Sequence, residues 1–496
     1  FPFPINIISF AGAGGIAFAS VIWDQATAVE VYSLHLLMLS LILHFSFKAY
    51  ISEKNTEKLF FLTAFFIGLS FANHMTTLLI LPAVFYMFFV SDGKPYLTQK
   101  RFKTLGILII PLFIGLSLYI YLPLISSTDP LFNWGDVSRG FNKFLYHVQG
   151  KQYQIWMFSD SESWSKNFGK FISSLPTQTA WIGLVFAIAG MYFTLRYAKR
   201  LFWLSIIIII SCLGYSLNYS IHDIETYFLS AYIGMYILIV IGMAGLLKKK
   251  NFSYIALAIP VLLLVMNFSY NDRSNERYVD EYTKVMTDGL AEDALIISSE
   301  WDMWCSAFWY YQGIEGHRKD IQLVELELMR RTWYPTMVER WYPPLYEQCE
   351  SNFESYLEIL EKFESSLPYD PREIQQQFVA LFRCMIDNNI DERPVYVTHD
   401  IMQSEPQIVQ GYTAMPEGLA VRLYKSDQSP QFNPGELDLT GFNNSIGPRS
   451  NHLTEATVNN ILSKLNTLHQ FALKYQKPEL AQAYNAQIRA INEKLK

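Results

Sequence analysis

Long apolar runs with few charged side chains make up most of the first 270 residues of the chain. A helix needs roughly 20 apolar residues to cross about 30 Å of hydrocarbon, and most of these runs have that length. The run 59–90 is too long for one crossing, so we expect a turn at Asn73 and His74 to divide it into two short spans. The other expected spans lie near residues 1–22, 29–50, 102–122, 178–198, 201–217, 227–247 and 252–269. The sequence therefore predicts a polytopic α-helical membrane protein with about nine spans.

Lysine and arginine are concentrated in four of the predicted loops, near residues 48–58, 94–103, 196–200 and 248–250. Loops with an excess of Lys and Arg tend to lie in the cytoplasm, and with nine spans all four loops fall on that side. The region after residue 269 is then expected on the extracytoplasmic side.

Four short polar clusters fall on the opposite side from the basic loops. They are WDQATAVE around Asp24, ANH ending at His74, DPLFNWGD around Asp136 and NYSIHDIET around Asp223. Acidic and imidazole groups at span ends are costly to keep near lipid, so their convergence on one face predicts a functional site. The net charge is −6 and no basic stripe is present, which gives no support to a nucleic-acid-binding protein.

The C-terminal region changes character and predicts a soluble α/β domain. Apolar runs at 294–299, 321–326, 394–400 and 418–425 are typical of short buried strands. Segments around 274–290, 353–363 and 371–388 have helical spacing between them, which favours a small, mainly parallel sheet. We therefore expect four domains: a membrane body at 1–269, an external α/β domain at 270–428, a linker at 429–454 and an amphipathic helical hairpin at 455–496, broken near Pro478.

The four cysteines do not have the spacing of a zinc site. Cys212 lies inside a predicted span and is expected to be a small buried apolar residue. Cys305, Cys349 and Cys384 lie in the external region, where a disulfide can form but an odd number leaves one thiol over. Cys349 with Cys384 is one candidate pairing.

Several motifs resemble, in the same order, the bacterial domain of unknown function 2723 family. They are IWDQATAVEVYSLHLLML, GLSFANHMTTLLILPA, YLPLISSTDPLFNWGD followed by HVQGKQY, NYSIHDIETYF, and SSEWDMWCSAFWYYQGIEGHRKDIQLVELEL, over roughly residues 15–335. That family is similar to protein O-mannosyltransferases, with the GT-C architecture of a multispan body, an extracytoplasmic active site and an external domain. The resemblance implies a glycosyltransferase of the bacterial inner (plasma) membrane. It would transfer a sugar, with mannose as one candidate, from a polyprenyl-phosphate donor to a hydroxyl of an exported protein or glycan.

One departure from the family pattern concerns the start of the chain. Members of the family begin with a span followed by an external loop that carries an Asp and a Glu, the segment that supplies the catalytic carboxylate in GT-C enzymes. This sequence opens at Phe1 and is expected to be a fragment that starts after that loop.

Transfer of a sugar to a hydroxyl needs a carboxylate that accepts the hydroxyl proton, and donors that stabilise the departing phosphate. Glu30 and Asp24 are the candidates for the catalytic carboxylate or for orienting the acceptor. The alternative for Asp24 is that it caps a helix starting near Gln25. The alternative for Glu30 is that it pairs with a cation in a preceding segment.

The remaining candidate residues would bind the substrates. His74 would donate to phosphate or hold a carboxylate and Asn73 would bond a sugar hydroxyl, unless the two form a polar turn satisfied by water. Trp134 would stack on a sugar ring, with Asn133 and Asp136 as hydroxyl partners, unless the tryptophan is an interfacial anchor. Candidate phosphate partners are the external cations Arg139, Lys143 and Lys151.

His222, Asp223 and Glu225 precede a predicted span that starts at Tyr227. Together these residues would hold the carrier phosphate or a divalent metal ion, and the metal ion would then be a cofactor. Simple capping of the helix by Asp223 and Glu225 is the alternative.

The pair Glu300 and Asp302 follows a predicted strand, which suggests an acceptor site at the end of the sheet. By contrast, the residues from His317 to Asp320 are expected to form a polar turn.

Two other functions are consistent with the sequence. A transporter component would require inverted repeats and ionisable residues at mid-membrane depth, whereas the predicted spans are nearly free of charge. A noncatalytic membrane scaffold with an external partner-binding domain is the second alternative.

Overall fold

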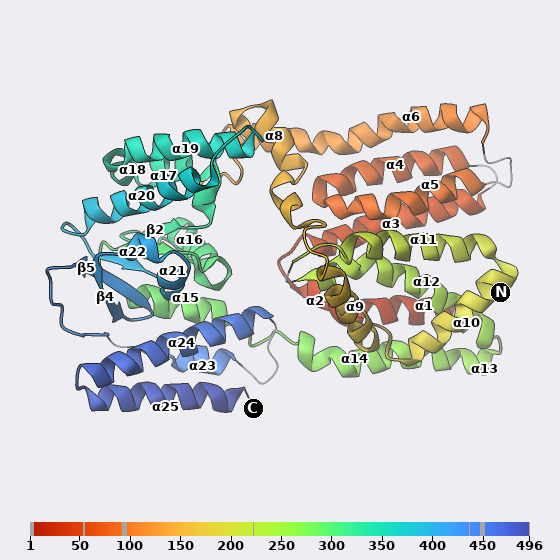
Figure 1. The fold of residues 1–496 in the computed structure, drawn as a ribbon. Coiled ribbons are helices and arrows are strands. Elements are labelled where there is room, and N and C mark those ends of the chain that lie inside the picture. Colours follow the sequence, from red (N-terminus) through yellow and green to blue (C-terminus); the bar gives the residue numbers. More distant parts are fainter. Residues whose placement is uncertain are drawn as a thin grey trace. The chain divides into compact units, whose positions relative to one another are not determined.

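The computed structural model describes residues 4–52, 55–91, 97–221, 223–435, 437–446 and 452–495. The chain divides into two compact units (Figure 1). The first, called here the membrane unit, comprises residues 1–128 and 137–273. The second, the α/β unit, comprises residues 129–136 and 274–496. The short segment 129–136 therefore belongs to the α/β unit, although its neighbours in sequence belong to the membrane unit.

The regular secondary structure of the membrane unit consists of helices in its described residues, apart from one isolated bridge between Met157 and Tyr219. Its helices are α1 (Pro4–Ala17), α2 (Ser20–Thr27), α3 (Tyr32–Ile51), α4 (Thr56–Asn73), η1 (Met75–Ile80), α5 (Leu81–Val90), α6 (Gln99–Leu116), η3 (Ser117–Ile120), α7 (Tyr121–Ser126), η4 (Val137–Arg139), α8 (Phe141–Val148), η5 (Lys151–Trp156), α9 (Ser163–Thr179), α10 (Ile182–Tyr197), α11 (Lys199–Ser216), η6 (Ile224–Phe228), α12 (Leu229–Leu246), α13 (Lys250–Ser253), η7 (Tyr254–Leu257) and α14 (Ala258–Asn271).

The predicted polytopic helical architecture is confirmed, with a smaller number of candidate spans than the nine expected. Among the described residues, five helical stretches are long and apolar enough to cross a membrane: Tyr32–Ile51, Gln99–Ser126, Lys199–Ser216, Ile224–Leu246 and Asn251–Asn271. Two bent pairs raise the number to seven if each is one span. The pair formed by α1 and α2 bends by 65°, and the pair formed by α9 and α10 bends by 99°.

The expected division of the run 59–90 is present. Helix α4 ends at Asn73, and His74 is the residue that precedes η1. The stretch Met75–Val90 is apolar but shorter than a typical span. The turn therefore lies where the polar pair interrupts the apolar pattern.

Glycines allow the membrane helices to pack closely, as small residues do in other membrane proteins. A Cβ atom on Gly68 of α4 would collide with the carbonyl oxygen of Leu112 in α6, and one on Gly115 of α6 would collide with that of Phe65. Helices α10 and α12 approach each other in the same way at Gly190 and Gly242.

The α/β unit contains a five-stranded sheet in the order β2-β1-β3-β5-β4. Its strands are β1 (Leu295–Ser298), β2 (Gln322–Glu325), β3 (Val395–Val397), β4 (Tyr412–Glu417) and β5 (Ala420–Lys425). Strand β1 pairs in parallel with β2 and β3, whereas β5 pairs antiparallel with β3 and β4. The sheet is therefore mixed and not mainly parallel, because the hairpin of β4 and β5 adds to an edge of the parallel part (Figure 1).

Helices surround this sheet. They are α15 (Tyr278–Asp288), the π-helical turns Trp301–Cys305 and Tyr311–Glu315 on either side of α16 (Ser306–Tyr310), η10 (Leu328–Arg330), α17 (Tyr334–Trp341), α18 (Pro343–Gln348), α19 (Glu350–Glu364), α20 (Pro371–Asn389), α21 (His399–Ser404), α22 (Pro406–Val409), α23 (Thr440–Ser445), α24 (His452–Lys474) and α25 (Pro478–Lys494). Helices α24 and α25 form the expected terminal pair, which lies side by side in Figure 1.

One hydrophobic core holds the α/β unit together, and it includes the terminal helices. Ile461 and Leu465 of α24 are fully buried in it. Phe432 and Phe442, from the segment predicted as a linker, are buried in the same core, while residues 447–451 of that segment lie outside the described residues. The helical pair is therefore packed on the α/β fold through its own side chains and those of the segment before it.

The cysteines follow the pairing considered from the sequence. Cys349 and Cys384 form a disulfide with a Cα–Cα distance of 5.9 Å. Cys212 and Cys305 are free thiols, and both are buried. The disulfide connects the start of α19 with α20, next to the apolar contact between these two helices.

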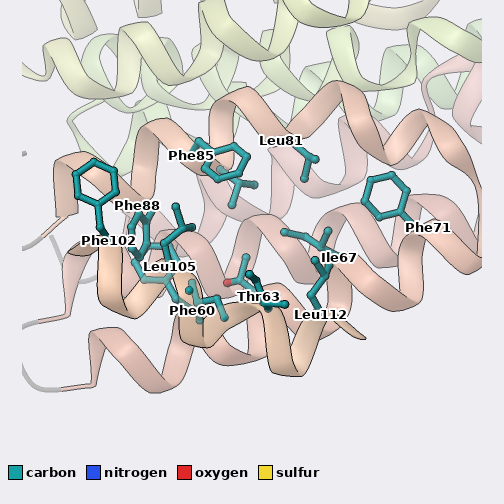
Figure 2. Close-up of a pocket in the computed structure, with 15 residues that line it drawn as sticks. Phe60, Thr63, Ile67, Phe71, Leu81, Phe85, Phe88, Phe102, Leu105 and Leu112 are labelled. Atoms are coloured by element: carbon teal, nitrogen blue, oxygen red, sulfur yellow. The ribbon is translucent and has the colours of Figure 1, made fainter. Parts of the chain in front are cut away.

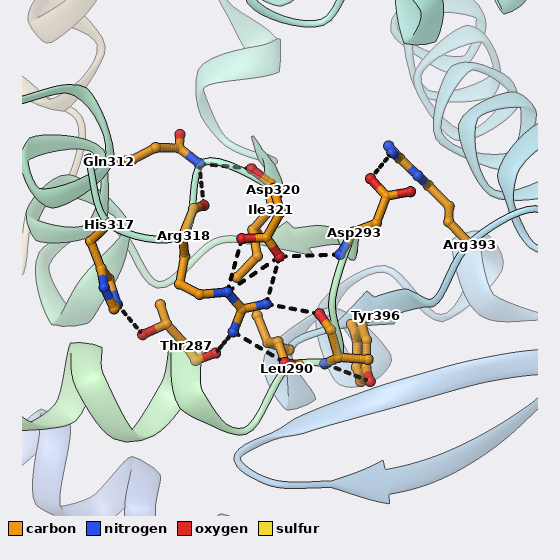
Figure 3. A network of polar contacts seen from close by, with 11 residues as sticks. Thr287, Leu290, Asp293, Gln312, His317, Arg318, Asp320, Ile321, Arg393 and Tyr396 are labelled. Atoms are coloured by element: carbon orange, nitrogen blue, oxygen red, sulfur yellow. Dashed lines mark hydrogen bonds and ion pairs between the residues drawn. The ribbon is translucent and has the colours of Figure 1, made fainter.

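Arg318 organises the turn that precedes β2 (Figure 3). Its guanidinium donates to the carbonyl oxygens of Thr287 and Ala291 at 2.6 and 2.9 Å, and to the carboxylate of Asp320 at 2.8 Å. The hydrogen bond from Arg318 to the Asp320 carboxylate lowers the pKa of Asp320 to about 2. The predicted polar turn thus connects the C-terminal end of α15 with the residues that precede β2.

Glu325, at the end of β2, is a buried carboxylate with an unusual pKa. One oxygen accepts a hydrogen bond from the Leu328 N–H at 2.5 Å, and the other has no partner among the described residues. Burial raises the pKa of Glu325 from 4.5 to about 8. The folded α/β unit therefore holds this proton more tightly than the unfolded chain does.

The raised pKa predicts a pH-dependent stability that Glu325→Gln removes. A carboxyl group with a raised folded-state pKa costs stability progressively as pH rises from the unfolded value toward the folded one. Between pH 5.0 and 6.5 this loss amounts to about 2 kcal/mol for the wild-type α/β unit. Thermal unfolding measured at several pH values should show that Glu325→Gln does not lose this stability between pH 5.0 and 6.5. Parallel curves for variant and wild type would contradict the prediction.

Candidate functional site

His74 forms the centre of a polar cluster at one end of the membrane helices. Its Nδ1 lies 2.6 Å from Oγ1 of Thr76 and accepts a hydrogen bond from the Thr76 N–H at 3.3 Å. Because Nδ1 is an acceptor, the neutral ring carries its proton on Nε2. Burial lowers the pKa of His74 to about 4, so the imidazole is neutral near pH 7.

A second histidine, His35 of α3, belongs to the same cluster. Its Nε2 lies 3.0 Å from Oγ1 of Thr76, so the threonine hydroxyl connects the two imidazoles. The two rings are 5.1 Å apart. His35 was not among the residues predicted from the sequence. The signal was the polar pair Tyr32 and His35, spaced i and i+3 at the start of an apolar helix.

Tyrosines form a wall beside His74. The ring of Tyr32 is 5.0 Å from the His74 ring, and the ring of the predicted Tyr227 is 6.0 Å from it. Tyr227 also contacts Tyr219 at 5.1 Å and Tyr215 at 6.3 Å. The cluster therefore brings phenol O–H groups and imidazole N–H groups together as hydrogen-bond donors among aromatic rings.

Two predicted carboxylates lie at the edge of this cluster. Glu30 lies next to Val31, whose carbonyl oxygen accepts a hydrogen bond from the Asn73 amide at 3.1 Å, and Asp223 directly precedes η6, which contains Tyr227. Glu30 is exposed and makes no hydrogen bond or ion pair within the described part of the chain. Asp223 occupies the position before η6, but its side chain makes no capping hydrogen bond. Asp223 thus occupies the N-terminal position of the capping alternative without the side-chain hydrogen bond of a cap.

Other predicted residues are engaged by protein partners. Asp24 lies inside α2, which begins at Ser20, so it does not cap a helix near Gln25. Its carboxylate pairs with Arg273 and accepts a hydrogen bond from Gln25 at 2.9 Å. Glu225 pairs with Lys170 at 3.4 Å. Helix α2 packs against Tyr32 and Tyr227 through Ile22 and Val21, so Asp24 belongs to the same end of the unit.

Asn73 has a structural contact that the sequence did not predict. Its amide nitrogen donates to the carbonyl oxygen of Val31 at 3.1 Å. This hydrogen bond fastens the end of α4 to the loop that carries Glu30. The amide oxygen of Asn73 has no protein partner among the described residues.

Three of the four predicted polar clusters thus meet in the membrane unit, and the fourth belongs to the α/β unit. Asn133, Trp134 and Asp136 all lie in the segment 129–136. Trp134 packs against Trp333 at 4.9 Å, Trp301 at 5.6 Å and Phe132 at 5.7 Å, so its ring belongs to an aromatic cluster of the α/β unit.

Asn133 and Asp136 are buried and joined by a hydrogen bond of 3.3 Å. They line a cavity of about 560 Å³ together with Asp129 and Glu350. Arg139 follows in η4 of the membrane unit.

The acceptor-site hypothesis for Glu300 does not agree with its environment. The Glu300 side chain is only 3% exposed, and its carboxylate is 2.7 Å from the ammonium group of Lys464 in α24. Its partner in the hypothesis, Asp302, is exposed at the start of the first π-helical turn. Glu300 is thus enclosed by the terminal helical pair and is not accessible to an acceptor.

The predicted metal or phosphate role of His222 cannot be followed, since His222 lies outside the described residues. Within the part of the chain that the structure describes, no group of three or more His, Cys, Asp or Glu side chains is arranged to hold a metal ion.

Comparisons with known proteins point to one activity. Residues 3–96 match the family described as Protein O-mannosyl-transferase TMEM260 N-terminal domain. The chain is 24% identical to Protein O-mannosyl-transferase TMEM260 of Mus musculus over 370 residues, which cover 67% of this chain and 51% of that protein. It is 23% identical to Protein O-mannosyl-transferase tmem260 of Dictyostelium discoideum over 483 residues, covering 86% of this chain and 56% of that protein.

The chain spans about half the length of these curated relatives. No solved structure matches it. The match to the TMEM260 N-terminal domain includes Asp24, Glu30, Asn73 and His74, so four residues of the polar clusters lie in the shared region. The chain is therefore a multi-pass membrane protein with distant homology to the TMEM260 protein O-mannosyl-transferases.

Proposed function

We propose that this protein is an integral membrane glycosyltransferase that moves mannose from a polyprenyl-phosphate donor to a hydroxyl of an exported protein or glycan. The single observation that supports the proposal is the position of Glu30 beside the His74 cluster, to which the Asn73–Val31 hydrogen bond joins its loop, in a chain distantly related to O-mannosyl-transferases. In this proposal the site faces the extracytoplasmic side of the bacterial inner membrane, as the basic loops at the opposite helix ends favour.

In the proposed reaction, the Glu30 carboxylate accepts the proton of the acceptor hydroxyl while the hydroxyl oxygen attacks C1 of the sugar. The bond between C1 and the phosphate oxygen breaks, and the phosphate leaves with the electron pair. This single displacement inverts the configuration at C1. Glu30 suits the role because its carboxylate is exposed and has no ion-pair partner among the described residues.

Asp24 suits a different role, since both of its carboxylate oxygens are already engaged by Arg273 and Gln25. We assign it to positioning α2, and with it the loop that carries Glu30.

The departing phosphate needs hydrogen-bond donors in a site with little water. His74 supplies a donor because its neutral ring holds the proton on Nε2, and Tyr32 and Tyr227 supply phenol groups beside it. Neutral donors favour a phosphate without adding a buried positive charge.

A reconstituted assay tests the function. The full-length protein in lipid vesicles should transfer radiolabelled mannose from polyprenyl-phosphate mannose to Ser- or Thr-containing acceptors and should not use GDP-mannose directly. One molecule of polyprenyl phosphate should be released for each glycosylated product that forms. Transfer from the nucleotide sugar would contradict the proposed donor. A protein that binds exported partners but transfers no sugar from either donor would be a scaffold.

A further inference from the structure

An apolar cavity of about 490 Å³ lies between α4, α5 and α6 of the membrane unit (Figure 2). Among the described side chains that line it, only Thr63 carries a polar atom. The Thr63 hydroxyl is already bonded, since it donates to the carbonyl oxygen of Leu59 at 3.0 Å and lies 3.4 Å from the Ser46 hydroxyl. The lining therefore suits hydrocarbon and offers nothing to a polar ligand.

The cavity is elongated along the helices. In Figure 2, Phe71 and Phe102 lie at opposite ends of the row of labelled side chains. On α4 the lining runs from Phe60 to Phe71, which corresponds to about 16 Å at 1.5 Å per residue. This shape fits a chain better than a compact molecule. Phe85, Phe102 and Ile109 are about half exposed, so the cavity can be reached from the lipid side.

Glycines explain why the space exists. Helices α4 and α6 cross in contact at Gly68 and Gly115, near the Phe71 end. Closer to the Phe102 end, Gly106 of α6 lines the cavity, and a Cβ atom added to it would meet no atom within 4 Å. The missing side chain at residue 106 thus leaves room that a larger residue would fill.

One end of the cavity lies close in the chain to the candidate functional site. Its lining ends at Phe71, and Asn73 and His74 follow within one turn of the chain. The Tyr119 hydroxyl donates to the carbonyl oxygen of Phe71 at 2.5 Å and holds this end of α4 in place. A chain lying in the cavity would therefore emerge beside the His74 cluster.

We infer that the cavity holds the hydrocarbon tail of the lipid-linked donor, with its phosphate at the His74 end. This inference rests on the proposed function for the identity of the lipid. The cavity then acts as a chain-length selector, because isoprene units that lie along α4 gain apolar contact and shorter carriers cannot fill the same length.

The test fills the cavity with Gly106→Leu in the full-length protein. The matched control is Gly214→Leu, since Gly214 of α11 also has no atom within 4 Å of a built Cβ and lies on an exposed helix face. The leucine side chain should exclude the tail from this part of the cavity and raise KM for a long-chain donor about ten-fold or more, which corresponds to about 1.4 kcal/mol of lost binding. KM for a two-isoprene donor should stay at the wild-type value, and Gly214→Leu should change neither. An equal rise for both donors, or no rise, would overturn the inference.

A second readout does not depend on catalysis. Lipids that remain bound to the purified protein are extracted and measured by mass spectrometry after incubation with polyprenyl phosphate. Wild type and Gly214→Leu should retain it, and Gly106→Leu should lose it. Retention by Gly106→Leu, or retention of ordinary phospholipid alone by the wild type, would overturn the cavity assignment. If Gly106→Leu loses the carrier and the wild type retains it but transfers no sugar, the cavity assignment stands and the proposed function is refuted.

Discussion

Glu30→Gln should lower the rate of sugar transfer by about 10²- to 10⁴-fold, the usual contribution of a general base. The amide has nearly the same shape as the carboxylate but cannot accept the hydroxyl proton. Glu30 is exposed and has no ion-pair partner among the described residues, so the substitution removes no contact that stabilises the fold. Steady-state kinetics in vesicles should therefore show a reduced kcat with KM for the lipid donor near the wild-type value.

Glu57→Gln is the matched control for this experiment. Glu57 lies in the first turn of α4, at the opposite end from His74, and forms an exposed ion pair with Lys100 at 3.1 Å. Exposed ion pairs contribute little to stability, so this variant should keep full activity. Asp24→Asn should give a smaller loss than Glu30→Gln, because Arg273 and Gln25 already engage that carboxylate. A larger loss for Asp24→Asn would transfer the catalytic role to Asp24.

Lys464→Met should destabilise the α/β unit by about 3–5 kcal/mol, the cost of leaving a buried charge without its partner. The Lys464 and Glu300 side chains are 1% and 3% exposed. The lysine ammonium also donates to the Tyr282 hydroxyl at 2.6 Å, and Asn460 donates to Glu300 at 2.8 Å. Loss of the ammonium therefore affects a network that joins α24, α15 and the end of β1. Thermal unfolding followed by circular dichroism measures the change.

The control for Lys464→Met is Lys362→Met in α19. Lys362 pairs with Glu358 at 2.8 Å, one helical turn away, on an exposed surface. Its removal should leave the midpoint of thermal unfolding near the wild-type value, because exposed ion pairs contribute little to stability. The double variant Lys464→Met with Glu300→Leu should recover part of the lost stability, since it removes the unpaired charge. Equal effects of the two single lysine variants would show that burial does not determine the outcome.

Much of the fold could be predicted from local patterns. The apolar runs predicted a polytopic helical unit, and four apolar segments predicted strands that became β1, β2, β3 and β5. Strand β4 was missed because it contains Pro416 and is only half buried over its first three residues. The bend between α9 and α10 was also missed. It uses left-handed backbone angles at Ala180 and Trp181, which neither residue type announces.

The candidate site was predictable in part for a similar reason. Asn73, His74 and Tyr227 were found because polar or amphipathic residues next to apolar runs stand out in sequence. His35 was missed because a single histidine inside an apolar helix is more often explained by packing. The environments of Glu300 and Trp134 depend on residues far away in sequence, Lys464 and Trp333, and no local pattern could indicate these partners.

Segment 129–136 has a practical consequence for anyone who divides this protein. Phe132 packs against Trp309 at 5.4 Å and Trp341 at 5.8 Å, and the Trp341 N–H donates to the carbonyl oxygen of Leu131 at 3.1 Å. A truncated polypeptide that begins at residue 274 would lack this segment and would expose the indole rings that Phe132 covers. Exposed apolar surface of this kind promotes aggregation during expression. Supplying the octapeptide in trans, or fusing it through a flexible tether, would be the remedy.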